Sequence, residues 1–247
     1  MRGSGVVVWE TFFKGVRREE RRLLSGQGTL GHLLIHYFEQ TIARRYAVTS
    51  GYIFSVDGTH MDRDSDLILF NRLHTPKMRS GVVPLIPAET TGAVIQTVEC
   101  LTESLLIEEA QHLQDVRALP KLTPKGYTSG IQLVTEHPYT MGLIVCAASE
   151  LSLTEIRDIL AKQQANTPLT ERVSAVFVLG QGLVLYDDPA TQEARYFPTE
   201  SSRLTVVERG EDTLAFLMLY VSSYLNSIEF IPPNFLKLLT TEHIPAE

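Results

Sequence analysis

Two segments near the start of the chain have apolar residues at helical spacing. Residues 6–24 form the first, with an aromatic first half and a charged second half. Residues 29–46 form the second, which follows Thr29, a residue type that caps helix N-termini. Its apolar stripe consists of Leu30, Leu33, Leu34, Tyr37, Phe38 and Ile42. Both segments therefore predict helices that bury one face.

Three apolar runs without helical spacing follow, and they predict strands at residues 51–56, 66–70 and 91–98. The run at 66–70 is almost continuous, as in a strand that is covered on both faces. Helical spacing returns at residues 103–119, and residues 141–147 form another buried run. From residue 29 onward, the predicted order of elements is α-β-β-β-α-β.

The remaining chain predicts further α/β structure. Ser152 and Glu155 form a capping-box pattern at the start of a helix. The Gly180-Gln181-Gly182 sequence lies between two apolar runs and predicts a hairpin turn, and residues 212–225 predict a long apolar helix. No repeat or linker divides the chain. We therefore expect an N-terminal helix in residues 1–28 and one domain in residues 29–247.

Composition and charge exclude some classes of protein. The net charge of −7 and the pI near 5.5 do not favour nucleic-acid binding through a broad basic face. No apolar stretch is long enough to span a membrane, and the N-terminus does not resemble a secretory signal. The two cysteines, Cys100 and Cys146, lie in apolar runs and predict buried thiols. We expect a cytoplasmic protein with no membrane partner.

Three segments of the central region carry a family resemblance. Asp66 opens a strand, Ile86-Pro-Ala-Glu89 follows, and Ala93-Val-Ile-Gln96-Thr-Val98 comes next, before Leu101-Thr102. The chain resembles an uncharacterised bacterial family of restriction-endonuclease-like domains of the PD-(D/E)XK type, in which these segments read Asp, Pro-x-Glu and Ala-Val-Ile-Glu-Val-Lys. The resemblance implies an α/β fold with an αβββαβ core, a mixed sheet flanked by helices, and a C-terminal extension of strands and helices.

The resemblance also implies a metal-dependent site with altered residues. Asp66 and Glu89 match two acids of the family, but Gln96 replaces the acid of the third strand and Val98 replaces its lysine. Intact members hold Mg²⁺ through carboxylates, and the lysine orients the attacking water. Glu99 alternates to the opposite strand face from Val98. The expected remnant catalytic site is Asp66, Glu89 and Gln96, with Asp66 and Gln96 as metal ligands only where activity is retained.

Three functions follow as hypotheses. The first is a catalytically impaired nuclease, a pseudo-nuclease without a cofactor, that acts as a binding or structural subunit in phage or mobile-element defence. Its expected partner is another protein or a second copy of the chain. The alternative is an active Mg²⁺-dependent DNA or RNA endonuclease that uses Asp66, Glu89 and Gln96. The third is an effector-sensing or immunity module that reuses the fold.

A second candidate metal site has weaker support. His32 and His36 are four residues apart on one predicted helix face, a spacing compatible with zinc. Two histidines provide half of a zinc site, and the sequence shows no third ligand. We therefore interpret them as residues of a surface or partly buried helix face.

Overall fold

A computed structural model of the chain describes residues 4–25, 28–122, 128–129, 132–133, 137–233 and 235. The α-helices are α1 (Ser4–Ser25), α2 (Leu30–Thr41), α3 (Glu103–Ala118), α4 (Leu153–Gln163) and α5 (Thr213–Ser227). The longer strands are β1 (Tyr46–Phe54), β2 (Ser65–Asn71), β5 (Thr91–Leu101), β8 (Met141–Ser149), β9 (Ala175–Val178), β10 (Gly182–Asp187) and β12 (Arg203–Glu208). The shorter strands are β3 (Met78–Ser80), β4 (Val83–Pro87), β6 (Thr128–Ser129), β7 (Gln132–Leu133) and β11 (Ala194–Arg195).

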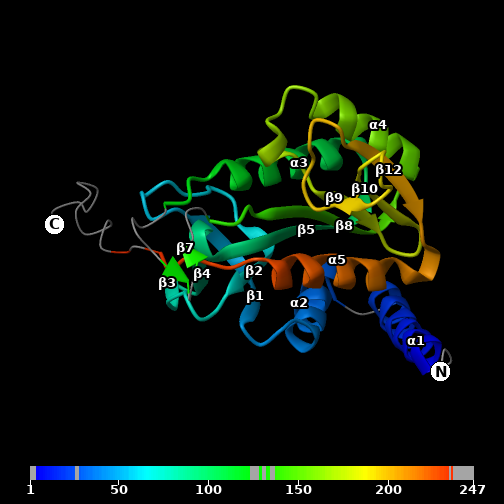
Figure 1. Ribbon diagram of the computed structural model, residues 1–247, viewed down its shortest axis with the longest axis horizontal. Helices are drawn as coiled ribbons and strands as arrows, with labels where there is room; N and C mark the ends of the chain where they lie inside the picture. Colours follow the sequence, from blue (N-terminus) through cyan, green and yellow to red (C-terminus); the bar gives the residue numbers. More distant parts are fainter. Residues whose placement is uncertain are drawn as a thin grey trace.

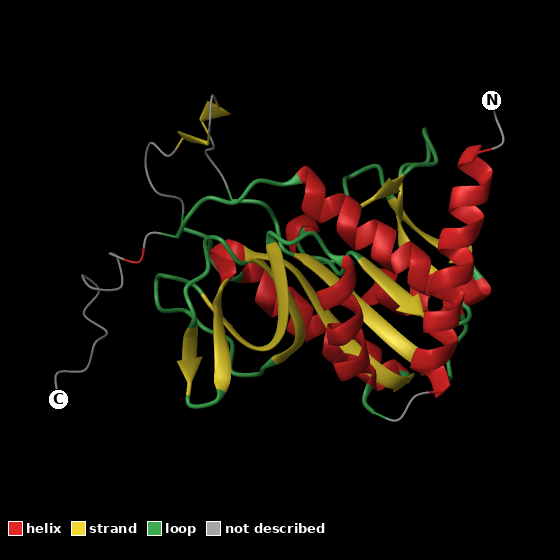
Figure 2. Ribbon diagram, turned by 90° about the horizontal axis from the view of Figure 1, so that it is seen from below, coloured by secondary structure: helices red, strands yellow, loops and turns green. Residues whose placement is uncertain are grey.

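The main sheet is mixed and has the order β11-β10-β9-β8-β5-β2-β1-β4-β3, with β12 also paired to β10. Strands β1, β2 and β5 are antiparallel neighbours, whereas β5, β8 and β9 run parallel. Helices α3 and α4 provide the crossovers between the parallel strands. The β6–β7 ribbon forms a separate small sheet and stands away from the main one (Figure 2).

Helices cover both faces of the sheet (Figure 1). Helices α1, α2 and α5 lie on one face, and their buried residues share a core cluster with Leu67, Leu69, Ala93 and Ile95 of the central strands. Helices α3 and α4 lie on the other face, where the core includes Ile68, Val94 and Val98. The alternation of these strand residues between two cores follows from the two-residue period of a strand.

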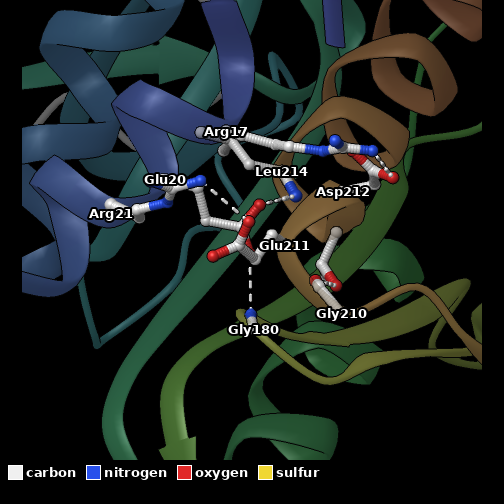
Figure 3. Close-up of polar contacts among 9 residues, drawn as sticks. Arg17, Glu20, Arg21, Gly180, Gly210, Glu211, Asp212 and Leu214 are labelled. Carbon is white, nitrogen blue, oxygen red and sulfur yellow. Dashed lines mark hydrogen bonds and ion pairs between the residues drawn. The ribbon is translucent and has the colours of Figure 1, made fainter. Parts of the chain in front are cut away.

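Helix α1 is fixed to the body of the protein by its second half (Figure 3). Glu20 is 1% exposed, and its carboxylate accepts hydrogen bonds from the Gly180 N–H at 2.6 Å and from the Leu214 N–H at 2.9 Å. Arg17 forms a two-point ion pair with Asp212, with contacts of 2.6 and 2.8 Å. Glu20 therefore joins α1 both to the first turn of α5 and to the β9–β10 turn.

The structure confirms most of the predicted elements. The order α-β-β-β-α-β appears as α2, β1, β2, β5, α3 and β8, and the predicted N-cap at Thr29 accepts a hydrogen bond from the His32 N–H. The capping box of Ser152 and Glu155 is present at the start of α4. The glycine-rich turn connects β9 to β10, as expected. The described part of the chain has no helix that is long and apolar enough to cross a membrane.

Some boundaries and environments differ from the predictions. Helix α2 ends at Thr41 and Tyr46 already begins β1, because the chain leaves the helix at Ile42 with extended backbone angles. The segment between β2 and β5, which contains Pro76, Pro84 and Pro87, forms the β3–β4 hairpin, and neither this hairpin nor β12 was predicted. Cys146 is buried as expected, but Cys100 is exposed because it lies near the end of β5.

Candidate active site

Asp66 lies at the start of β2, where this strand and β5 begin to separate. The last paired residues in this direction are Leu67 and Ile95, and β5 continues to Leu101 without further pairing to β2. One carboxylate oxygen of Asp66, Oδ2, accepts hydrogen bonds from the Thr97 main-chain N–H at 2.7 Å and from the Thr97 hydroxyl at 2.8 Å. Asp66 is thereby held against the face of β5 that Thr97 occupies.

Glu99 is the next residue on the same face of β5, because side chains alternate along a strand. Its Oε1 accepts a hydrogen bond of 2.7 Å from the Leu30 N–H, in the first turn of α2. Gly31 brings this helix turn close to the strand, since a Cβ atom at this position would lie 3.1 Å from the Thr97 hydroxyl and 4.0 Å from the Asp66 Cβ. The N-terminal end of α2 therefore lies directly over Asp66 and Thr97.

These residues surround an open hollow of about 350 Å³ between α2, β1, β2 and β5. Its lining consists of Thr29, Gly31, His32, Ile35, Ser50, Asp66, Thr97 and Glu99. Asp66 and Glu99 are the acidic members, and among the described residues no lysine or arginine belongs to the lining. The exposed His32 side chain lies at its edge, as expected for a surface histidine.

The oxygen atoms in this hollow suit a hard divalent cation. Mg²⁺ keeps several water ligands and is usually held by one or two carboxylates, which Asp66 and Glu99 can supply. Each carboxylate uses one oxygen in the hydrogen bonds described above. No group of three or more histidine, cysteine or acidic side chains able to hold a metal occurs among the described residues, so a zinc-type cage is not formed there.

Gln96 and Val98 are turned away from this hollow, which corrects the expectation that they lie beside the Asp66 carboxylate. Val98 belongs to the core beneath α3 and α4. Gln96 is 0% exposed, and neither its Oε1 nor its Nε2 atom has a hydrogen-bond partner in the described structure. Side chains alternate between the two faces of β5. Asp66 is hydrogen-bonded to Thr97, which lies between Gln96 and Val98 in the sequence, so those two side chains point to the opposite face.

Glu89 lies in a short 3-10 helix before β5, at the other end of this strand from Asp66. The distance along the strand from Thr91 to Gln96 alone is about 16 Å, so Glu89 cannot share a metal ion with Asp66. The fully buried Glu89 carboxylate accepts hydrogen bonds from the Ser55 hydroxyl and the Val56 N–H, and burial raises its pKa. Its surroundings are those of a structural residue.

The positions of Thr97, Glu99 and Ser50 in the lining of this hollow were not predicted from the sequence. Glu99 carried a usable signal: an acidic residue near the end of an otherwise apolar strand, on the face opposite Val98. What the sequence did not show is which of the two β5 faces the Asp66 carboxylate meets. Thr97 and Ser50 gave no sequence signal that distinguishes them from other strand hydroxyls.

Comparisons with known proteins identify the fold. No protein-family model matches the chain, and neither does any curated protein sequence. Among solved structures, the apo form of NucC from E. coli MS115-1 matches with a TM-score of 0.74 and 15% identity, over 94% of this chain and 97% of that one. The cAAA-bound NucC of P. aeruginosa ATCC27853 matches with a TM-score of 0.70 and 15% identity, over 98% and 100% of the two chains. The fold is therefore restriction-endonuclease-like, as expected.

These matches correct the leading functional hypothesis. NucC is a nuclease that cleaves DNA, and its fold covers nearly all of this chain. The pseudo-nuclease hypothesis rested on Gln96 and Val98 as replaced catalytic groups, and neither side chain faces the hollow. The hypothesis is wrong. Gln96 and Val98 lie on the buried face of β5, so their identity does not bear on catalysis at the face that carries Thr97 and Glu99.

Proposed function

We propose that this chain is a divalent-cation-dependent nuclease whose site is formed by Asp66, Thr97 and Glu99. The observation that carries the proposal is that Asp66 and Glu99, from strands that are neighbours in the sheet, line the same hollow beneath the N-terminus of α2. Both are oxygen donors of the type that Mg²⁺ binds. The similarity of the fold to NucC over its whole length supports a nuclease reaction.

The side chains of the site have distinct roles in this proposal. Asp66 and Glu99 would hold Mg²⁺, which supplies Lewis-acid polarisation of a phosphate and a more acidic bound water. Thr97 is a positioning residue, because its two hydrogen bonds fix the Asp66 carboxylate. The Leu30 N–H fixes Glu99 in the same way.

The N-terminus of α2 replaces part of the charge that a lysine would provide. In the part of the chain that the structure describes, no lysine lines the hollow. The dipole of a helix favours an anion at its N-terminal end, and the α2 N-terminus lies at this hollow, although its Leu30 and His32 N–H groups already donate to Glu99 and Thr29. The phosphodiester to be cleaved therefore approaches between the helix end and the two carboxylates.

The comparison structures suggest a setting for this activity. NucC is an effector nuclease of antiviral defence, and two of its matching structures contain bound cAAA, a cyclic oligonucleotide. By analogy, we propose a homo-oligomeric defence nuclease that a small nucleotide ligand controls. The net charge of −7 agrees with transient rather than tight binding of the nucleic-acid substrate.

The experiment is a cleavage assay with purified full-length protein, linear and supercoiled DNA, and RNA, in Mg²⁺, Mn²⁺ or EDTA, with and without cAAA. We expect metal-dependent cleavage that Asp66→Asn or Glu99→Gln reduces at least 100-fold. Calorimetry should show weaker Mn²⁺ binding by each variant. The matched control is Asp64→Asn, because Asp64 is exposed and does not line the hollow.

Two results would reject the proposal. One is the absence of metal-dependent cleavage under every condition tested, with the protein shown to be folded by circular dichroism. The other is full cleavage and unchanged Mn²⁺ affinity in both Asp66→Asn and Glu99→Gln.

A further inference from the structure

Arg117, near the end of α3, has a buried guanidinium whose hydrogen bonds are largely missing. Its Nε and Nη2 atoms are shielded from solvent and have no hydrogen-bond partner in the described structure. Its Nη1 reaches the Ser174 hydroxyl at 3.5 Å, the limit of a hydrogen bond. No ion pair with Arg117 occurs among the described residues, whereas other arginines such as Arg17 and Arg63 have carboxylate partners. Arg117 as a whole is partly exposed, but two of its guanidinium nitrogens are buried without a partner among the described residues.

The surroundings of Arg117 are aromatic. Its guanidinium carbon lies 5.0 Å from the centre of the Phe197 ring. The Phe197 ring contacts Tyr139 and Tyr224, which extend the aromatic cluster. The hydroxyls of Tyr220 and Tyr224 already donate to main-chain carbonyls, of Arg195 and Tyr139 respectively. These hydroxyl groups are therefore not anionic partners for the guanidinium.

A second cation, Lys121, lies near Arg117, and the acids Glu171 and Glu89 act on Arg117 and Lys121 respectively. Burial lowers the pKa of Arg117 to about 10, which leaves it protonated at neutral pH, and Tyr224 and Glu171 oppose this shift. The buried ammonium of Lys121 is close enough for mutual repulsion with Arg117. Leaving buried donors of a charged group unsatisfied costs free energy, and proteins retain such groups mainly at functional positions.

We infer that Arg117 anchors an anion-binding site that takes the phosphate group of a nucleotide. The planar guanidinium presents Nε and Nη2 as a pair of parallel donors, the arrangement that binds two phosphate oxygens at once. The exposed ring of Tyr139, which contacts Phe197, provides a face on which a nucleobase stacks once Phe197 has moved. Phe197 now covers the guanidinium, so the ligand displaces this ring or inserts beside it.

This site is distinct from the proposed nuclease centre. Arg117 packs on Gly142, at the start of β8, where the paired residue of β5 is Val94. Glu99 lies near the other end of β5, opposite the Cys146–Ala148 region of β8. The intervening strand length is about 16 Å, so one phosphate group cannot occupy both sites.

The test measures binding in EDTA without any nuclease readout, so it is independent of the proposed function. Inorganic phosphate, AMP and adenosine are titrated against the full-length protein by calorimetry and by thermal unfolding. We expect AMP and phosphate to bind and raise the Tm, and adenosine to bind at least tenfold more weakly than AMP. Arg117→Met should weaken AMP binding at least tenfold. The exposed Arg203, which pairs with Asp187 at 3.2 Å, provides the control variant Arg203→Met.

Two further measurements separate a ligand site from a structural arginine. Arg117→Met should leave the ligand-free protein as stable as the wild type or more stable, because it removes an unpaired buried charge. Phe197→Ala should keep or increase AMP affinity, because it uncovers the guanidinium. The inference is overturned when neither phosphate nor AMP binds at 10 mM, or when Arg117→Met binds AMP as the wild type does. A large loss of stability in ligand-free Arg117→Met would also overturn it.

Discussion

The Asp66 carboxylate accepts hydrogen bonds from both the main-chain N–H and the side-chain hydroxyl of Thr97, at 2.7 and 2.8 Å. This pair of contacts determines which face of β5 belongs to the candidate site. Glu99 shares that face with Thr97, whereas Gln96 and Val98 face the core beneath α3. The site therefore has two acids and a hydroxyl, in place of the two acids and the lysine of the family pattern.

Thr97→Val tests whether the hydroxyl positions Asp66. Valine has nearly the same shape but cannot donate, so the Asp66 carboxylate keeps only the main-chain donor. We expect nuclease activity and Mn²⁺ affinity to fall about 10- to 100-fold, the range found when groups that orient metal ligands are removed. Stability should fall by about 1–2 kcal/mol in urea unfolding. Unchanged metal affinity would show that Thr97 has only a structural role.

Gly31→Ala tests the close approach of α2 to Asp66 and Thr97. The added methyl group would lie 3.1 Å from the Thr97 hydroxyl and must displace either the helix turn or the hydroxyl. We expect reduced Mn²⁺ affinity by calorimetry and at least tenfold lower cleavage. The control is Gly15→Ala in the middle of α1, where a Cβ meets nothing within 4 Å. That change should stabilise the protein by about 0.5–1 kcal/mol.

Much of the fold was predictable because its signals are local. The stripe of α2, the capping box at Ser152 and the turn at Gly180 each depend on residues that are close together in the sequence. The site was less predictable, because it depends on how Asp66 leaves β2. Leu67 pairs with Ile95, and continuing this register would place Asp66 opposite Gln96. At the end of the pairing the carboxylate instead turns to Thr97, a one-residue difference that only the tertiary structure shows.

Gln96→Leu tests this correction directly. The Gln96 amide is fully buried, and both of its polar atoms lack partners among the described residues. Leucine has a similar volume and removes the cost of the unsatisfied amide, about 1–3 kcal/mol. We expect a protein that is equally or more stable in urea and that retains its cleavage activity. Loss of cleavage without loss of stability would instead indicate that Gln96 takes part in the reaction.

The buried Lys121 predicts a pH dependence of stability. Burial lowers the pKa of its ammonium to about 7, against an opposing effect of Glu89, and its Nζ donates to the Thr91 and Pro138 carbonyls. The unfolded state, with a pKa near 10.5, binds more protons than the folded state between these values. Stability should therefore rise from pH 7 toward pH 10.5, by at most about 1.4 kcal/mol per pH unit.

The measurement for Lys121 is urea unfolding at several pH values, compared between wild type and Lys121→Met. The methionine variant should lack this part of the slope, whereas Lys162→Met, at an exposed position, should retain it. Equal slopes in all three proteins would mean that Lys121 keeps an ordinary pKa in the folded state.

The contacts of Glu20 predict that this residue holds α1 to the rest of the protein. Its carboxylate accepts the N–H groups of Gly180 and Leu214, and burial raises its pKa while these two bonds oppose the rise. Glu20→Ala leaves two donors without an acceptor and should cost about 2–5 kcal/mol in urea unfolding. Glu19→Ala, which removes an ion pair with the exposed Arg22, should cost less than about 1 kcal/mol.

The same variants distinguish local release of α1 from loss of the whole fold. If Glu20 mainly anchors α1, hydrogen exchange in Glu20→Ala should increase in α1 and in the first turn of α5, while β5 and β8 keep their protection. Cleavage and metal binding should then persist, because α1 does not line the hollow of Asp66 and Glu99. Uniformly faster exchange across the sheet would instead make Glu20 part of the global core.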